Sequence, residues 1–179
     1  MATITTRPMT FEEFTRLPEP QGLRYELHHG ELVEMPPPQM PHSRARRRLR
    51  ALLETALPGI VVEPEIGFVV SEAEYRIADI LCVTQARWDA RTSDEWLHGA
   101  PELAIEILSP SNSAIEIRDK RKLCLANGSV EFWLVDPSQR DVEVCTRDGR
   151  SMTYGAGQQI PLFFVEGSTI PVDAIFEQN

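Results

Sequence analysis

The stretch from Glu102 to Asn112, E-L-A-I-E-I-L-S-P-S-N, has the pattern of a β-strand that is buried on both faces, and the rest of the fold is arranged around it. One face carries three apolar side chains, those of Leu103, Ile105 and Ile107. The opposite face carries Ala104 and Leu108, with Glu106 between them. A carboxylate in the middle of a strand that otherwise forms core requires an explanation.

A second carboxylate has similar surroundings. The stretch R-I-A-D-I-L-C-V, residues 76–83, also has the pattern of a strand, with Asp79 on the same face as Leu81 and Val83. A buried, ionised carboxylate without a partner costs several kcal/mol, so Asp79 and Glu106 must each be paired, protonated or bound to a cation. On neighbouring strands, the two carboxylates would form half of a site for a divalent metal ion.

Mg²⁺ and Mn²⁺ suit such a site, because they are bound by a few carboxylates, backbone carbonyls and water, and the carbonyl of Ile107 is a natural third ligand. On the helix expected at residues 113–127, Lys120 lies on the apolar side, three residues after Ile117 and four before Cys124. An inward lysine beside the metal could orient the attacking water and offset negative charge in the transition state of phosphodiester hydrolysis.

A purely structural interpretation is also open. Asp79 or Glu106 could form an ion pair with Arg76, Arg118 or Lys120, because perturbed charges also occur in structural networks. The residue pattern alone does not decide between a metal site and buried ion pairs.

Composition and local patterns predict one domain over residues 1–179. Helices are expected at residues 10–17, 42–57 and 113–127, a hairpin at residues 24–35 before the proline run 36–38, strands at residues 60–70, 76–83, 102–108 and 130–136, and a second hairpin at residues 141–154. The three cysteines lie in apolar runs, which predicts buried thiols rather than disulfides. The sequence shows no leader or membrane span, so a cytoplasmic protein is expected.

Charge is unevenly distributed. The net charge of −9 argues against a surface that binds polyanions everywhere, yet five of the 18 basic side chains lie between Arg44 and Arg50. We predict nucleic-acid contacts from Arg44, Arg46 and Arg47, and from His42 at the start of the same helix, which could instead cap that helix. A solvated helix face is the alternative for the arginines.

Several motifs together resemble one family. They are Y-E-L-H-H-G-E-L-V-E-M-P from Tyr25, the helix that starts at His42, A-D-I from Ala78, P-E-L-A-I-E-I-L-S-P-S from Pro101, and Lys120 followed by G-S-V-E-F-W-L-V-D-P from Gly128. This set resembles the Uma-two family of bacterial restriction endonucleases, within the PD-(D/E)XK nuclease superfamily. The resemblance covers residues 10–136.

The resemblance implies an α/β fold with a restriction-endonuclease-like core, in which a central mixed β-sheet is flanked by helices and preceded by an N-terminal helix and a β-hairpin. It implies a metal-dependent endonuclease that cuts nucleic acid, and analogy with endonuclease-like folds makes a homodimer plausible. We favour DNA over RNA as the substrate, although the sequence does not distinguish them. Asp79 and Glu106 would hold Mg²⁺ or Mn²⁺. The signature lysine position, two residues after Glu106, is Leu108, so the lysine role would fall to Lys120.

The resemblance also brings Glu26 into the site from the hairpin, although the residue pattern alone would make Glu26 an ordinary strand residue between Tyr25 and Leu27. The proline that usually precedes the family's aspartate is Ala78 here. A catalytically inactive module that keeps the fold and binds DNA or protein is the alternative function.

Overall fold

The computed structural model describes residues 7–18, 24–35, 40–91, 96–110 and 112–177. Its helices are α1 (Phe11–Thr15), α2 (Met40–Ala56), α3 (Gln85–Asp89), α4 (Ala114–Ala126) and α5 (Val172–Phe176). Its strands are β1 (Arg24–His28), β2 (Glu31–Met35), β3 (Ile60–Pro64), β4 (Gly67–Ser71), β5 (Glu74–Ile77), β6 (Ile80–Thr84), β7 (Leu97–His98), β8 (Leu103–Ile107), β9 (Glu131–Asp136), β10 (Asp141–Thr146), β11 (Ser151–Tyr154), β12 (Gln159–Pro161) and β13 (Thr169–Pro171).

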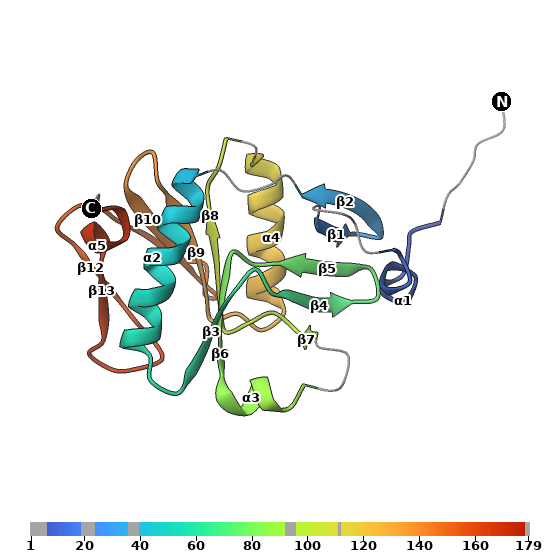
Figure 1. Cartoon of the computed structure of the whole chain (residues 1–179), viewed down its shortest axis with the longest axis horizontal. Coiled ribbons are helices and arrows are strands. Elements are labelled where there is room, and N and C mark those ends of the chain that lie inside the picture. The colour runs from blue at the N-terminus through green and yellow to red at the C-terminus, as the bar shows by residue number, and fades with distance from the viewer. Residues whose placement is uncertain (1–6, 19–23, 36–39, 92–95, 111, 178–179) are drawn as a thin grey trace.

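The strands form a six-stranded sheet in the order β11-β10-β9-β8-β6-β3, a five-stranded sheet in the order β2-β1-β5-β4-β7, and the small pair β12-β13 (Figure 1). The six-stranded sheet is mixed, because β8 pairs parallel with β9 and antiparallel with β6. The predicted α/β fold, with a mixed sheet, flanking helices and an N-terminal hairpin, is confirmed.

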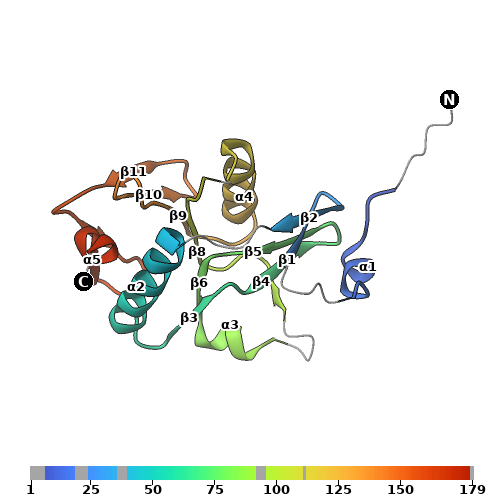
Figure 2. The same cartoon turned by 45° about the horizontal axis from the view of Figure 1, so that its top comes forward.

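Strand β8 lies between two helical layers, with α2 and α4 on opposite sides of it (Figure 2). The apolar side chains predicted for one face pack against α2 in a cluster that contains Leu103, Ile105, Ile107, Ala45, Leu49 and Leu53. On the other face, Ala104 packs in a second cluster with Cys124 of α4. The predicted alternation is therefore correct, and it directs Glu106 toward α4.

The two long strands predicted at residues 60–70 and 76–83 are each broken in two. At the break, Glu65 has a positive φ of 57° and Asp79 lies in a bend between β5 and β6. The antiparallel pair stays together across the bend, since the Ala78 N–H donates to Ile66 O at 3.3 Å and the Glu65 N–H to Asp79 O at 3.2 Å. Strands β3 and β6 belong to the six-stranded sheet, whereas β4 and β5 belong to the five-stranded one.

This bend corrects the predicted place of Asp79. Alternation through an unbroken strand would put Asp79 on the face of Leu81 and Val83, but Ala78 packs there instead. Alternation holds only within a regular strand, and the bend interrupts it one residue before β6 begins. Asp79 therefore belongs to neither β5 nor β6 and lies at the junction of the two sheets, where it is half-buried.

The helix ends follow their local signals. Helix α1 begins with a capping box between Thr10 and Glu13, as predicted, and α4 begins with a second one between Ser113 and Glu116. Helix α2 begins two residues earlier than predicted, at Met40, because a proline at position 41 fits the first turn of a helix. The proline run at residues 36–38 lies outside the described residues.

Cys82, Cys124 and Cys145 are free and buried, as predicted. Within the ranges that the structure describes, no helix has the length and apolar character needed to span a membrane.

Candidate active site

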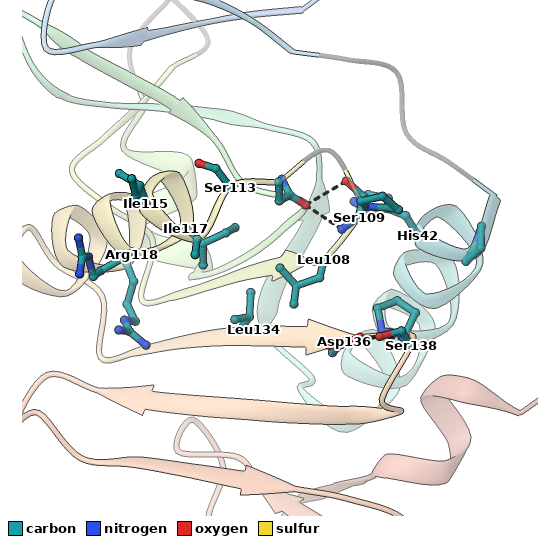
Figure 3. Close-up of a pocket in the computed structure, with 16 residues that line it drawn as sticks. His42, Leu108, Ser109, Ser113, Ile115, Ile117, Arg118, Leu134, Asp136 and Ser138 are labelled. Atoms are coloured by element: carbon teal, nitrogen blue, oxygen red, sulfur yellow. Dashed lines mark hydrogen bonds between the residues drawn. The ribbon is translucent and has the colours of Figure 1, made fainter.

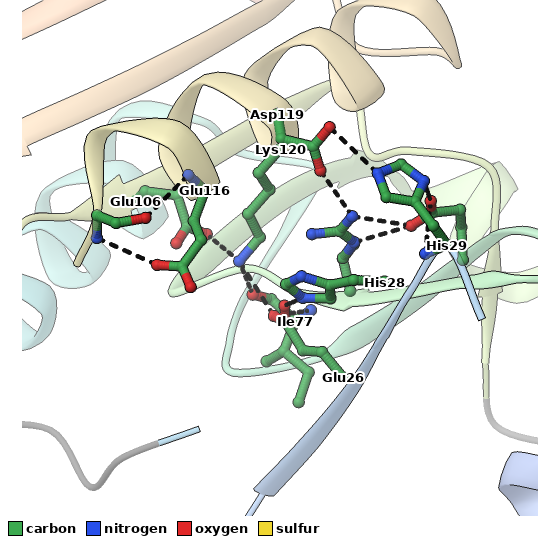
Figure 4. Close-up of polar contacts among 11 residues, drawn as sticks. Glu26, His28, His29, Ile77, Glu106, Glu116, Asp119 and Lys120 are labelled. Carbon is green, nitrogen blue, oxygen red and sulfur yellow. Dashed lines mark hydrogen bonds and ion pairs between the residues drawn. The ribbon is translucent and has the colours of Figure 1, made fainter. Parts of the chain in front are cut away.

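Lys120 projects from α4 toward the strands and joins two carboxylates (Figure 4). Its Nζ atom lies 2.9 Å from Glu106 Oε1 and 3.2 Å from Glu26 Oε1, and it donates to the carbonyl oxygen of Ile77. The inward orientation predicted for Lys120 is confirmed, whereas Lys122 is exposed. Burial would lower the pKa of Lys120, but the carboxylates of Glu106 and Glu26 outweigh burial and raise it, so the ammonium stays charged.

Glu26 reaches the same place from β1 of the hairpin. Its Oε1 atom also accepts the Ile77 N–H at 2.8 Å, and its Oε2 atom lies 2.5 Å from His28 Nε2. Burial raises the pKa of Glu26, but the charge of Lys120 and the hydrogen bonds together lower it to about 2. Both oxygens of Glu26 are thus engaged, and its position fits a residue that holds Lys120.

The pKa of Glu106 is shifted in the opposite direction from that of Glu26. Burial raises its pKa, the nearby Asp79 and Glu26 carboxylates raise it further, and Lys120 only partly offsets these effects. Its Oε1 atom is buried and pairs with Lys120 by charge, without the geometry of a hydrogen bond. The site therefore contains more negative charge than Lys120 balances, which is the condition that a bound cation would relieve.

Asp79 is fixed beside Glu106 through the backbone of β8. Its Oδ2 atom accepts the N–H of Ile107 at 2.8 Å and contacts His42 Nε2 at 2.9 Å. The Asp79 side chain is 18% exposed, so it keeps access to solvent. The bend between β5 and β6 thus brings the carboxylate of Asp79 to the residue that follows Glu106.

The residues predicted for catalysis and metal binding line one pocket of about 350 Å³. They are Glu26, Asp79, Glu106, Ile107 and Lys120. Across the part of the chain that the structure describes, no three His, Cys, Asp or Glu side chains form a metal-binding group. Two carboxylates, a backbone carbonyl and water nevertheless suit hydrated Mg²⁺ or Mn²⁺, and the incompletely satisfied Glu106 oxygen fits the same interpretation. Zn²⁺ would require more side-chain ligands.

The residues predicted to contact nucleic acid separate into three places. His42 is buried and contacts Asp79. Arg46 forms an ion pair with Glu65. Arg44 and Arg47 line a different cleft, formed by α2 and α5.

Sequence reasoning missed an ion-pair network around Arg76, whose side chain is fully buried. Arg76 does not pair with Asp79 or Glu106. Its Nη2 atom lies 2.9 Å from Glu74 and 2.8 Å from Asp119, and the exposed His29 contacts the same two carboxylates. Since Asp119 precedes Lys120 on α4, this network anchors the helix to β5 next to the lysine (Figure 4). The charged residues of this network are visible in the sequence, but the sequence does not show which of them pair, because Arg76 and Asp119 lie far apart in the chain.

The low pKa of Glu26 predicts a specific acid sensitivity. A carboxyl whose pKa falls from 4.5 to about 2 on folding stabilises the protein above pH 4.5, and this stabilisation is lost as the pH falls toward 2. The loss amounts to about 3 kcal/mol. We expect Glu26→Gln to be less stable at neutral pH and to show a shallower decline of the unfolding free energy between these pH values, measured by urea denaturation. An unchanged slope would contradict the ion-pair assignment.

Comparisons with known proteins agree with this architecture. The model of the Uma2 family, described as "Putative restriction endonuclease", matches residues 11–176. The structure is similar to the crystal structure of "a putative nuclease belonging to DUF820" from Anabaena variabilis, with a TM-score of 0.83 over 94% of this chain and 98% of that chain. The two sequences are 23% identical, so this likeness concerns the fold. None of the curated proteins matches the chain.

Proposed function

Because the chain belongs to the Uma2 family, we propose that it is a metal-dependent nuclease that hydrolyses phosphodiester bonds in nucleic acid, DNA rather than RNA. One observation carries the proposal. Asp79 accepts the backbone N–H of Ile107 directly beside Glu106, and Lys120 lies 2.9 Å from Glu106 in the same pocket. Two carboxylates next to a buried ammonium can hold a divalent cation and stabilise the negative charge that develops during phosphodiester hydrolysis.

Each residue has a distinct part in the proposal. Asp79, Glu106 and the Ile107 carbonyl would hold Mg²⁺ or Mn²⁺, which supplies Lewis acidity toward the scissile phosphate when it is bound. Lys120 orients the attacking water and offsets the negative charge that develops on the phosphate. Glu26 keeps Lys120 charged and in place, and His42 orients the carboxylate of Asp79.

The proposal is tested with fluorescently labelled DNA and the purified protein in Mg²⁺, Mn²⁺ or EDTA. We expect cleavage with either metal ion, none in EDTA, and none with Asp79→Asn. Cleavage in EDTA, or full activity of Asp79→Asn, would contradict it. A homodimer would supply one site for each strand of a duplex, and we include it in the proposal for that substrate. Analytical ultracentrifugation measures the oligomeric state.

A second candidate function is a catalytically inactive module that binds DNA or protein. The observation that favours it is the buried ion pair between Lys120 and Glu106, which could hold the fold together without any metal. DNA binding without cleavage in any of the metal ions, with Asp79→Asn binding equally well, would support this function.

The raised pKa of Glu106 predicts how metal affinity depends on pH. Metal binding requires the ionised carboxylate, and burial favours the protonated form of Glu106. We expect the Mn²⁺ association constant to fall by roughly tenfold for each pH unit below this raised pKa, because one proton must leave. Calorimetry in two buffers with different ionisation enthalpies measures the released proton. A constant affinity between pH 6 and about 8, without proton release, would contradict metal binding that is linked to deprotonation of Glu106.

A further inference from the structure

A cleft on the α2–α5 side of the molecule is lined by several arginines. It has a volume of about 430 Å³, and we call it the arginine cleft after the four residues Arg44, Arg47, Arg48 and Arg140. Elsewhere on α2, Arg46 pairs with Glu65, and Arg50 pairs with two glutamates. No ion pair to a described residue involves the four cleft arginines. One acidic residue, the exposed Glu177, also lines the cleft.

This clustering is unusual for the chain, because 27 acidic residues are available against 18 basic ones. Arg44, Arg47 and Arg140 are exposed, so solvent and salt screen much of their mutual repulsion, and an anion bound between them would remove the rest. Guanidinium groups bind phosphates and carboxylates with two parallel hydrogen bonds, and the proposed nuclease function makes a backbone phosphate the anion that would reach this cleft.

Figure 3 shows a further pocket of about 900 Å³, which we call the apolar pocket. Leu108, Ile117 and Leu134 form part of its walls. It shares Pro41 and Pro137 with the arginine cleft. It also shares four residues with the active-site pocket: His42, Ser109, Asn112 and Ile117. The three hollows are thus adjacent, in the order carboxylate site, apolar pocket and arginine cleft.

The chemistry of the walls indicates what each hollow accepts. A base or a sugar would bury the apolar surface of Leu108, Ile117 and Leu134 in this pocket, and Arg118 and Arg121 on its wall could contact the backbone phosphate of the same nucleotide. The main acid on its wall, Asp136, is already engaged, since its Oδ1 atom accepts hydrogen bonds from Ser138 and the Gln139 N–H. A base of a duplex is stacked and paired, and it reaches such a pocket only when it leaves the helix.

We propose that the substrate strand is unpaired next to the scissile bond, with a nucleotide in the apolar pocket and a neighbouring backbone phosphate in the arginine cleft. This inference rests on the proposed nuclease function, and it names single-stranded nucleic acid, including loops and frayed ends, as the substrate class. Phosphate contacts supply affinity, and the apolar pocket selects against paired bases.

The test measures binding of fluorescein-labelled single-stranded DNA and of the matching blunt duplex by anisotropy, in EDTA so that no cleavage occurs. We expect the single strand to bind at least tenfold more tightly than the duplex.

The double variant Arg47→Gln/Arg140→Gln should weaken single-strand binding by roughly tenfold or more and should make binding less sensitive to salt. Ile115→Glu, on an exposed wall residue of the apolar pocket, should also weaken it. The control is Arg150→Gln, an exposed arginine outside these hollows.

Equal affinity for single strand and duplex would overturn the inference, and so would unchanged binding by the double arginine variant. Hydrolysis of the small diester bis(p-nitrophenyl) phosphate with Mn²⁺ tests the proposed chemistry separately, because this compound has a single phosphate and no neighbouring backbone phosphate to bind in the arginine cleft. We expect the arginine variant to hydrolyse it at the wild-type rate. Loss of this hydrolysis in the arginine variant would show damage to the active site itself and would contradict a separate phosphate site.

Discussion

Glu106→Gln should lower the rate of metal-dependent DNA cleavage at least about 1,000-fold while the protein remains folded. The substitution keeps the size of the side chain and removes the charge that we assign to metal binding. Lys120 would keep its contact with Glu26 at 3.2 Å and its hydrogen bond to the Ile77 carbonyl, so the buried ammonium would retain a partner. Single-turnover cleavage assays and circular dichroism measure the two quantities.

A matched control for this variant is Glu131→Gln. Glu131 is also a buried strand glutamate, but it accepts a hydrogen bond from Trp133 Nε1 at 2.7 Å and does not line the active-site pocket. We expect it to retain activity when folded. If Glu106→Gln cleaved DNA at a rate close to that of the wild type, Glu106 would be a structural partner of Lys120 and nothing more.

Lys120→Met should produce the second large effect, a loss of cleavage of about 100-fold to 10,000-fold. It should also destabilise the protein by about 3–5 kcal/mol, because Glu26 and Glu106 would remain buried without their counter-charge. A metal ion can partly replace that charge. We therefore expect Mn²⁺ to raise the melting temperature of the variant more than that of the wild type.

Lys122→Met is the control for the second prediction, because Lys122 lies on the same helix with an exposed side chain. It should change neither activity nor stability measurably. A Lys120→Met protein that is stable and fully active would remove Lys120 from the mechanism. A variant that is destabilised but gains nothing from Mn²⁺ would place the lysine in a structural network alone.

Regular patterns predicted the parts of the site that lie within regular elements. Alternation along β8 placed Glu106 on the face opposite the α2 cluster, and helical periodicity pointed Lys120 inward. Both rules depend only on local backbone geometry, which the sequence encodes directly. The family resemblance places Glu106 and Lys120 in the same site, and the family model matches most of the chain.

The bend at Asp79 could not be predicted in this way. Hydrophobic alternation continues through residues 76–83, but the chain leaves one sheet and enters another there, which depends on how β3 and β4 pair with it. Tertiary pairing of this kind overrides the local pattern. Asp79 therefore reaches the site through the bend and through its hydrogen bond to the Ile107 N–H, and not through strand alternation.

Glu26 and the Arg76 network were beyond the reach of residue patterns for a related reason. Glu26 and Lys120 are 94 residues apart, and Arg76 and Asp119 are 43 apart. No single-sequence rule pairs charges at such separations. Once the hairpin and α4 are packed against β5, burial leaves each charge few partners, and the ion pairs follow from the requirement that buried charges be compensated.

Asp79 and Glu106 jointly hold a divalent cation in the proposed nuclease. Calorimetric titration of Mn²⁺ into the wild type, Asp79→Ala and the exposed control Asp148→Ala tests this metal site. We expect one binding site in the wild type and in Asp148→Ala, and no measurable binding in Asp79→Ala. Equal binding by all three proteins, or none by the wild type, would contradict the metal site and leave Asp79 and Glu106 as members of a structural charge network.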